Sequence, residues 1–162
     1  MCEADWSSEA RAASAYARKS RWCAAVVSDN ALADFATAPT WFDGGAPDYV
    51  NQTDPTDQNP VSVGCGMAFI SWLLSQNLGL SSIARVLVAL GSEGTLAQLY
   101  ANLTGNDADT AYPTFMGAIR GLSGGVTNDD PFGGLSSSRR VQAAASRPHR
   151  LLPPWAQISN AG

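Results

Sequence analysis

The sequence predicts a mainly α fold, a small helical bundle of about five helices with one long packed acidic loop and a disordered C-terminal tail. Apolar residues recur at helical spacing through the middle of the chain, and capping residues and glycines bound most of these runs. At 162 residues the chain fits one domain, and its 45% hydrophobic residues are typical of a globular protein. We therefore expect one buried helical core.

The chain divides into three expected parts. An N-terminal helix lies within residues 1–30, where the alanine-rich stretch from Ser8 to Val27 has high helix propensity. A helical core domain covers residues 31–122 and includes the acidic loop, residues 40–63. Residues 123–162 form a disordered or loosely packed tail, because turn residues are followed by a stretch without periodicity.

Four helices are expected in the core domain. The first is apolar on nearly all sides, which predicts burial between other elements, and the next three each carry an apolar stripe. The expected helices are 64–77 after an N-cap at Ser62, 82–90 after Ser81, 96–103 after Thr95, and about 109–122 with Pro113 in its first turn.

The acidic loop reads TWFDGGAPDYVNQTDPTDQNPVSV. Three prolines and two adjacent glycines make regular structure improbable between Thr40 and Pro60. Trp41, Tyr49 and Val50 are expected to fold back onto the helices and make this a packed loop. A long irregular segment in a compact domain is often functional, so the loop is the candidate site.

Composition excludes several classes of partner. All acids lie within residues 1–130, and an acidic body argues against nucleic acid as a partner. No apolar run reaches membrane-spanning length, which argues against a membrane partner. The first residues lack a positive region followed by an apolar one, so no signal peptide is expected. A protein or a glycan remains as the candidate partner.

Known catalytic and cofactor motifs are missing from the sequence. There is no HExxH, P-loop or GxGxxG helix start, and the single histidine, His149, lies in the tail. The three cysteines form no CxxC pair. We therefore predict no catalytic residue and no cofactor other than calcium, and we favour a non-enzymatic domain.

The polar and aromatic side chains of the acidic loop are the candidate ligand-binding residues. The ligand-binding candidates are Trp41, Asp43, Asp48, Tyr49, Asp54 and Asp57, and the candidate calcium ligands are Asp43, Asp48, Asn51, Asp54 and Asp57. Calcium prefers such oxygen ligands. The same acids suit two other roles: a carboxylate pair for glycan hydrolysis, and turns stabilised by Asp and Asn side chains.

Part of the chain resembles a known family. The run WFDGGAPDYVNQTDPTDQNPVSVGCGMAFISWLLSQ, followed by TLAQLYANLTG, is similar to a family of uncharacterised, mostly secreted bacterial and fungal proteins. The resemblance covers roughly Phe35 to Phe115. It implies an extracellular location in those relatives and carries no established activity.

A second resemblance is to zinc peptidases of the gluzincin or basic-secretory-protein type. Trp41, the segment from Asp48 to Val50, and the pattern Leu96-x-x-Leu99-Tyr100 are similar to the C-terminal half of those enzymes. Gly44 stands where their glutamate metal ligand would be, and HExxH is absent. The resemblance implies the C-terminal remnant of a degenerate metallopeptidase-like hydrolase, an alternative to a binding domain and to a carboxylate-dependent glycan hydrolase.

Overall fold

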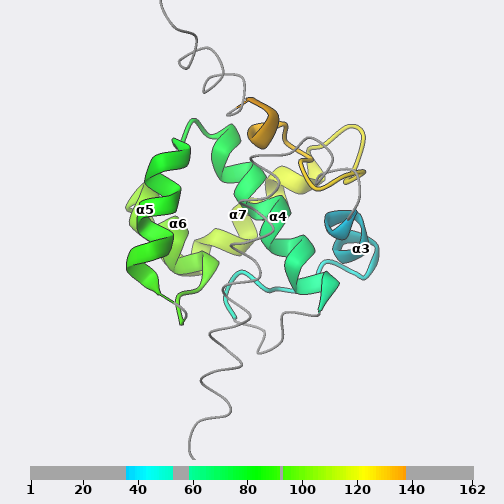
Figure 1. The fold of residues 1–162 in the computed structure, drawn as a ribbon. Coiled ribbons are helices and arrows are strands. Elements are labelled where there is room, and N and C mark those ends of the chain that lie inside the picture. Colours follow the sequence, from blue (N-terminus) through cyan, green and yellow to red (C-terminus); the bar gives the residue numbers. More distant parts are fainter. Residues whose placement is uncertain (1–35, 53–58, 92, 138–162) are drawn as a thin grey trace, which may run out of the picture.

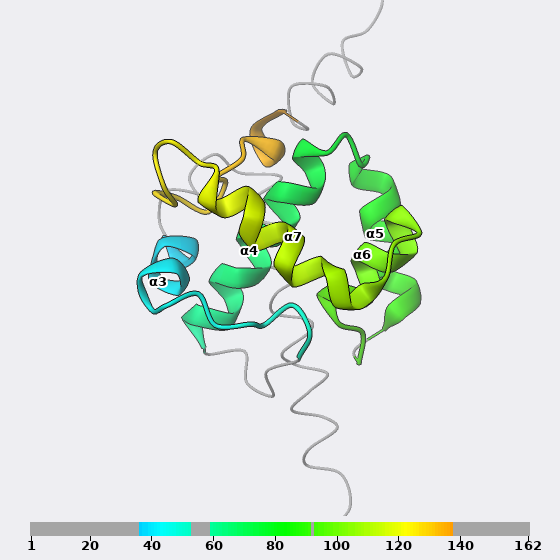
Figure 2. The ribbon, with the colours of Figure 1, turned by 180° about the vertical axis from the view of Figure 1, so that it is seen from behind.

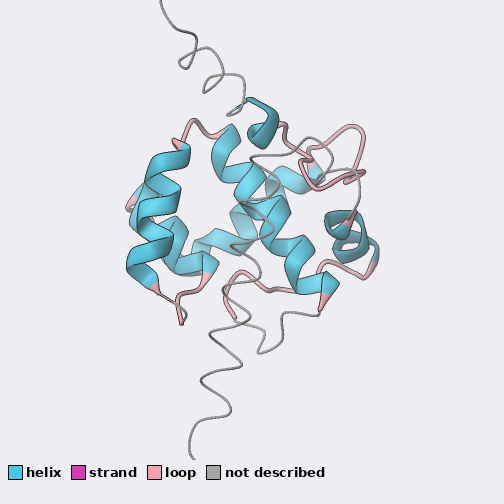
Figure 3. Cartoon of the chain, in the orientation of Figure 1, coloured by secondary structure: helices cyan, strands magenta, loops and turns pink. Residues whose placement is uncertain are grey.

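The computed structural model of the chain describes residues 36–52, 59–91 and 93–137. These residues form helices and loops and contain no strand, which confirms the mainly α prediction (Figure 3). In order, the helices are α3 (Thr37–Asp43), α4 (Pro60–Ser75), α5 (Leu80–Leu90), α6 (Leu96–Thr104), the 3₁₀ turn η1 (Ala108–Thr110) and α7 (Ala111–Arg120). The predicted helix from Ser8 to Val27 lies outside the described residues.

Helix α4 is the central element, and nearly all of it is buried (Figure 1). Its apolar composition on all sides predicted this burial. It begins at Pro60, four residues before the predicted start, because Asn59 serves as the N-cap in place of Ser62. The Asn59 side chain accepts a hydrogen bond from the Val61 N–H, and a proline at the first helical position lacks only an N–H that would have no intrahelical partner.

Helix α3 corrects the sequence prediction, which made regular structure improbable between Thr40 and Pro60. The helix runs from Thr37 to Asp43 and packs along α4. Pro39 fits because it lies in the first turn, where a missing N–H breaks no helical hydrogen bond. We call residues 44–59 the α3–α4 loop; the structure describes residues 44–52 and 59 of it, and residues 53–58 lie outside the described part.

Helices α5 and α6 pack against each other on the side of α4 that is opposite to α3 (Figure 1). Helix α5 begins at Leu80 with Gly79 at its N-cap, and Ile83 is its fully buried residue. Helix α6 has the predicted cap: the Thr95 side chain accepts from the Gln98 N–H, and the Gln98 side chain accepts from the Thr95 N–H. The predicted positions of both helices are confirmed to within two residues.

Helix α7 crosses α4 and closes the bundle on the face that Figure 2 shows in front. The ring of Phe115 in α7 contacts the ring of Phe69 in α4 edge-on, with ring centroids 5.2 Å apart. Trp72, also on α4, stacks on Tyr100 of α6 at 5.7 Å. These aromatic pairs connect α4 to both neighbours and form the centre of the core. Helix α7 is shorter than the predicted helix of 109–122, because the first residues of that range form η1.

The residues after α7 extend the core domain beyond the predicted boundary at Leu122. We call residues 126–137 the strap. Val126 and Leu135 of the strap are buried, and a short helical turn of residues 134–137 lies beside the C-terminal end of α4 (Figure 1). Gly134 lies so close to α4 that an added Cβ would be 2.2 Å from the Ser71 carbonyl oxygen. Residues 138–162 lie outside the described part.

Candidate functional site

Trp41 anchors the start of the α3–α4 loop. Its side chain is fully buried and stacks on Phe115, with ring centroids 5.5 Å apart. Its indole N–H donates to the Pro47 carbonyl oxygen at 2.9 Å, which ties the loop backbone to this buried side chain. Trp41, a candidate ligand-binding residue, is thus placed in the core and positions the loop.

Asp48 organises the middle of the loop as a turn. Its Oδ1 accepts from the Val50 N–H at 2.9 Å and from the Asn51 N–H at 3.1 Å, and its Oδ2 accepts from the Asn51 side-chain amide at 2.7 Å. The Gln52 side-chain amide donates to the Asp48 carbonyl oxygen. The carboxylate therefore serves the local turn that Asp and Asn side chains commonly stabilise.

Two further hydrogen bonds connect the loop to its surroundings. The Ala97 N–H at the start of α6 donates to the carbonyl oxygen of Val50 at 3.0 Å. The Asn59 side-chain amide donates to the Tyr49 hydroxyl at 3.1 Å, so the middle of the loop is joined to its last residue before α4. Val50 itself is fully buried. The prediction that Tyr49 and Val50 fold back onto the helices is confirmed.

Tyr112 of α7 holds the loop from another side. Its hydroxyl donates to the Ala46 carbonyl oxygen, and its ring is half-buried. Burial raises the pKa of the Tyr112 hydroxyl above the ordinary value of 10.0, the nearby Asp48 and Cys65 raise it further, and Arg120 acts in the opposite direction. The neutral, donating form is therefore the stable one in the fold.

The polar candidates are placed differently from one another. Asp43 is exposed at the last residue of α3, and Asn51 is exposed and bonded to Asp48. Asp54 and Asp57 lie outside the described residues. Within residues 36–52, 59–91 and 93–137, no group of three or more His, Cys, Asp or Glu side chains could hold a metal ion. The structure thus brings together Asp48 with Asn51 and Tyr49 with Asn59.

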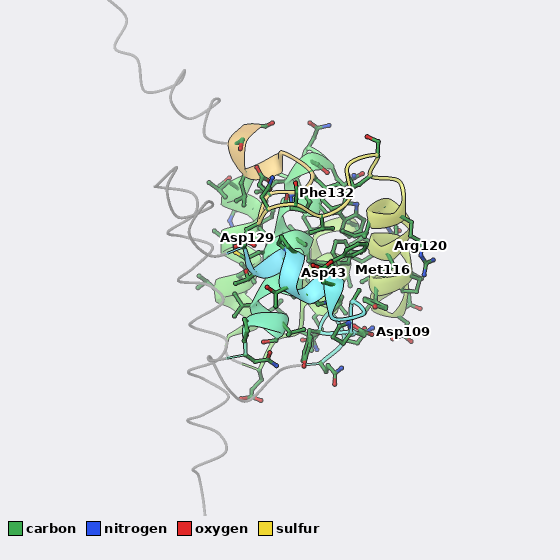
Figure 4. The ribbon with its side chains drawn as sticks, turned by 90° about the vertical axis from the view of Figure 1, so that its right-hand side faces the viewer. Asp43, Asp109, Met116, Arg120, Asp129 and Phe132 are labelled. Carbon is green, nitrogen blue, oxygen red and sulfur yellow. The ribbon has the colours of Figure 1, made fainter. Side chains whose placement is uncertain are left out.

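Asp129 was not predicted as a functional residue. It is buried in the strap, where its Oδ1 accepts from the Ala38 N–H at 2.6 Å and its Oδ2 from the Thr37 hydroxyl at 3.0 Å. Figure 4 shows Asp129 at one end of α3 and Asp43 at the other. The carboxylate therefore caps the start of the helix that leads into the loop.

Asp130 fixes the strap to α4. Its Oδ1 accepts from the Ser71 hydroxyl at 2.5 Å and from the Leu135 N–H at 3.0 Å, and its Oδ2 accepts from the Ser136 N–H at 2.9 Å and the Ser136 hydroxyl at 2.8 Å. The sequence offers one signal for this role. Two adjacent acids stand next to Pro131 and Phe132 in a stretch without other charges, which is typical of capping and turn residues.

Neither the protein-family models, the curated proteins nor the solved structures contain a match to this chain. In the part of the chain that the structure describes, no helix has both the length and the apolar character needed to span a membrane. The functional interpretation therefore rests on the loop and on the residues that hold it.

Proposed function

We propose that this chain is a non-enzymatic binding domain and that the α3–α4 loop is its recognition element. The observation that carries the proposal is the way the loop is held. The Trp41 indole, the Tyr112 hydroxyl and the Ala97 N–H each donate to a different loop carbonyl, at Pro47, Ala46 and Val50. A loop fixed by three helices loses little conformational entropy when it binds.

The polar side chains of this region lie on the outside of the fixed backbone. Asp43, Asn51 and Gln52 are exposed, whereas Trp41 and Val50 point into the core. Binding sites are commonly loops with this arrangement, in which a rigid scaffold presents polar groups to solvent. The arrangement supports recognition of a polar ligand or partner.

A cation of the calcium class is the ligand to test first. Calcium takes carboxylate, amide and carbonyl oxygens as ligands. Among the described residues, Asp48 Oδ2 accepts one hydrogen bond, from Asn51, and a carboxylate oxygen has two lone pairs. Asp43 is exposed at the last residue of α3. The Asp48 oxygen supports a cation held through a monodentate carboxylate oxygen together with other loop oxygens.

Calcium titration of the purified chain, followed by thermal melting, tests this proposal. A ligand that binds only the folded state stabilises it by about 2.7 kcal/mol at a hundred times its dissociation constant, so the melting temperature should rise with calcium concentration. Asp48→Asn should reduce the rise, since it removes a charged ligand. Glu93→Gln removes an exposed charge outside the loop and serves as the matched control.

The outcomes separate clearly. A melting temperature that does not move at millimolar calcium (on the order of a thousand times the dissociation constant of a sensor site) rejects the cation. An equal rise in Asp48→Asn and in the wild type places the ion elsewhere and rejects the loop as its site.

A further inference from the structure

Helix α3 has no N-cap of its own. Its N-cap position is Ala36, whose methyl group cannot accept a hydrogen bond, and the backbone there is left-handed, with φ of 30°. A helix of seven residues is too short to be stable in isolation. Its first turn must therefore be held by groups from elsewhere in the chain.

Asp129 supplies the missing cap from the strap. Its two carboxylate oxygens accept from the backbone N–H of Ala38 and from the hydroxyl of Thr37. Thr37 and Asp129 are only 4% and 2% exposed, so solvent competes little with these bonds. A carboxylate at the start of a helix also interacts favourably with the helix dipole.

The strap holds Asp129 in place through different residues. Asp130 binds the Ser71 hydroxyl of α4, and Gly134 packs against the backbone of α4 near Ser71. The Phe132 N–H donates to the same Ser71 hydroxyl at 3.2 Å. The position of the Asp129 carboxylate therefore depends on the strap being packed against α4.

From α3 the connection continues into the α3–α4 loop. Asp43 ends the helix, Gly44 and Gly45 turn the chain, and Trp41 holds the Pro47 carbonyl. We propose that Asp129 is a positioning residue through which the strap controls the order of the loop. When the strap is packed against α4, α3 is capped and the loop is held. When the strap is detached from α4, both α3 and the loop become mobile.

The effect of this coupling on ligand binding rests on the proposed function, because the coupling regulates the same loop. Its physical content is the two states of the first turn of α3, capped and uncapped. The order of the loop can be measured without any ligand. A failure of calcium binding would thus leave the coupling intact, and the reverse also holds.

Hydrogen exchange of the full chain, read by mass spectrometry, tests the coupling. Asp129→Ala should speed exchange in residues 37–52 about ten-fold relative to residues 80–104, the change expected for a lost helix cap. Asp129→Asn should restore part of the protection, because the amide oxygen can still accept from the Ala38 N–H. This rescue separates capping from simple filling of space.

A second variant displaces the strap from α4 and leaves Asp129 unchanged. Gly134→Ala places a Cβ 2.2 Å from the Ser71 carbonyl oxygen and should also speed exchange in residues 37–52. In the Asp129→Ala background it should add little there, because both changes act through one cap. The control is Ile83→Ala, which destabilises α5 on the other side of α4 (Figure 1).

Three results would overturn the coupling. Unchanged exchange in residues 37–52 of a folded Asp129→Ala chain would do so. So would an equal relative increase in Ile83→Ala, or full additivity of Asp129→Ala and Gly134→Ala. If Asp129→Ala does not fold, Thr37→Val removes one of its two bonds, and unchanged exchange in that variant would equally reject the coupling.

Discussion

Gly64→Ala tests a close backbone contact, where α4 meets the start of α3. An added Cβ at Gly64 would lie 1.9 Å from the Thr37 carbonyl oxygen and 2.4 Å from the Thr37 carbonyl carbon. These are backbone atoms, so no side-chain rotation can relieve the contact, and α3 must move away from α4. Overpacking costs about 1–3 kcal/mol, and here the upper part of that range applies.

The gain in helix propensity opposes this cost only in part. Alanine is about 1 kcal/mol better than glycine inside a helix, so the net loss in the free energy of unfolding should be about 2 kcal/mol. Gly117→Ala in α7 is the matched control, because nothing lies within 4 Å of a Cβ added there. It should stabilise the chain by about 0.5–1 kcal/mol.

Urea denaturation followed by far-UV circular dichroism measures both variants. The two substitutions are chemically identical and should move the midpoint in opposite directions, with an unchanged denaturant slope. A Gly64→Ala chain as stable as the wild type would show that α3 does not approach α4 as closely as described.

Two further predictions concern the loop and α6. The pKa of Tyr112 is raised in the folded state, so the unfolded chain loses this proton first as pH rises. The stability that Tyr112 contributes should be complete below about pH 10 and lost as pH rises through the folded pKa, and Tyr112→Phe should flatten this part of a stability-against-pH curve. Thr95→Ala should lower the free energy of unfolding by about 1 kcal/mol in urea titrations, because it breaks the capping box of α6; an unchanged midpoint would contradict that role.

The sequence predicted the helices whose signals are local. Helices α5 and α6 have apolar stripes and stop at Gly91 and Gly105, so spacing and capping rules place them. Helix α4 was recognised by its apolar composition, and its start was placed four residues too late because Ser62 and not Asn59 was expected to be its N-cap. The caps and stop signals of these helices are contacts between residues close together in the chain, which is why sequence rules predict them.

Helix α3 could not be predicted for the opposite reason. It is short, contains Pro39, and takes its cap from Asp129, some ninety residues further along the chain. No local pattern records such a contact. The strap was missed in the same way, because its stability comes from Asp130 and Gly134 meeting α4 and not from a periodic pattern.

The candidate site was predictable in its anchors and not in its geometry. Aromatic and β-branched residues in a polar segment predicted that Tyr49 and Val50 fold inward, and Val50 is fully buried. Which oxygens of Asp48 are occupied depends on the turn that forms around it. The Ala46–Tyr112 contact joins two elements far apart in sequence and has no local signal.

The backbone order of the α3–α4 loop tests the central claim most directly. Nitrogen-15 relaxation of the amides of residues 44–46 and 48–52 would give their order parameters in solution. A loop fixed by Trp41, Ala97 and Tyr112 should show values of about 0.85, equal to those of α4 and α6. Values below about 0.6 would mean that the loop is flexible, and a pre-formed recognition element would be excluded.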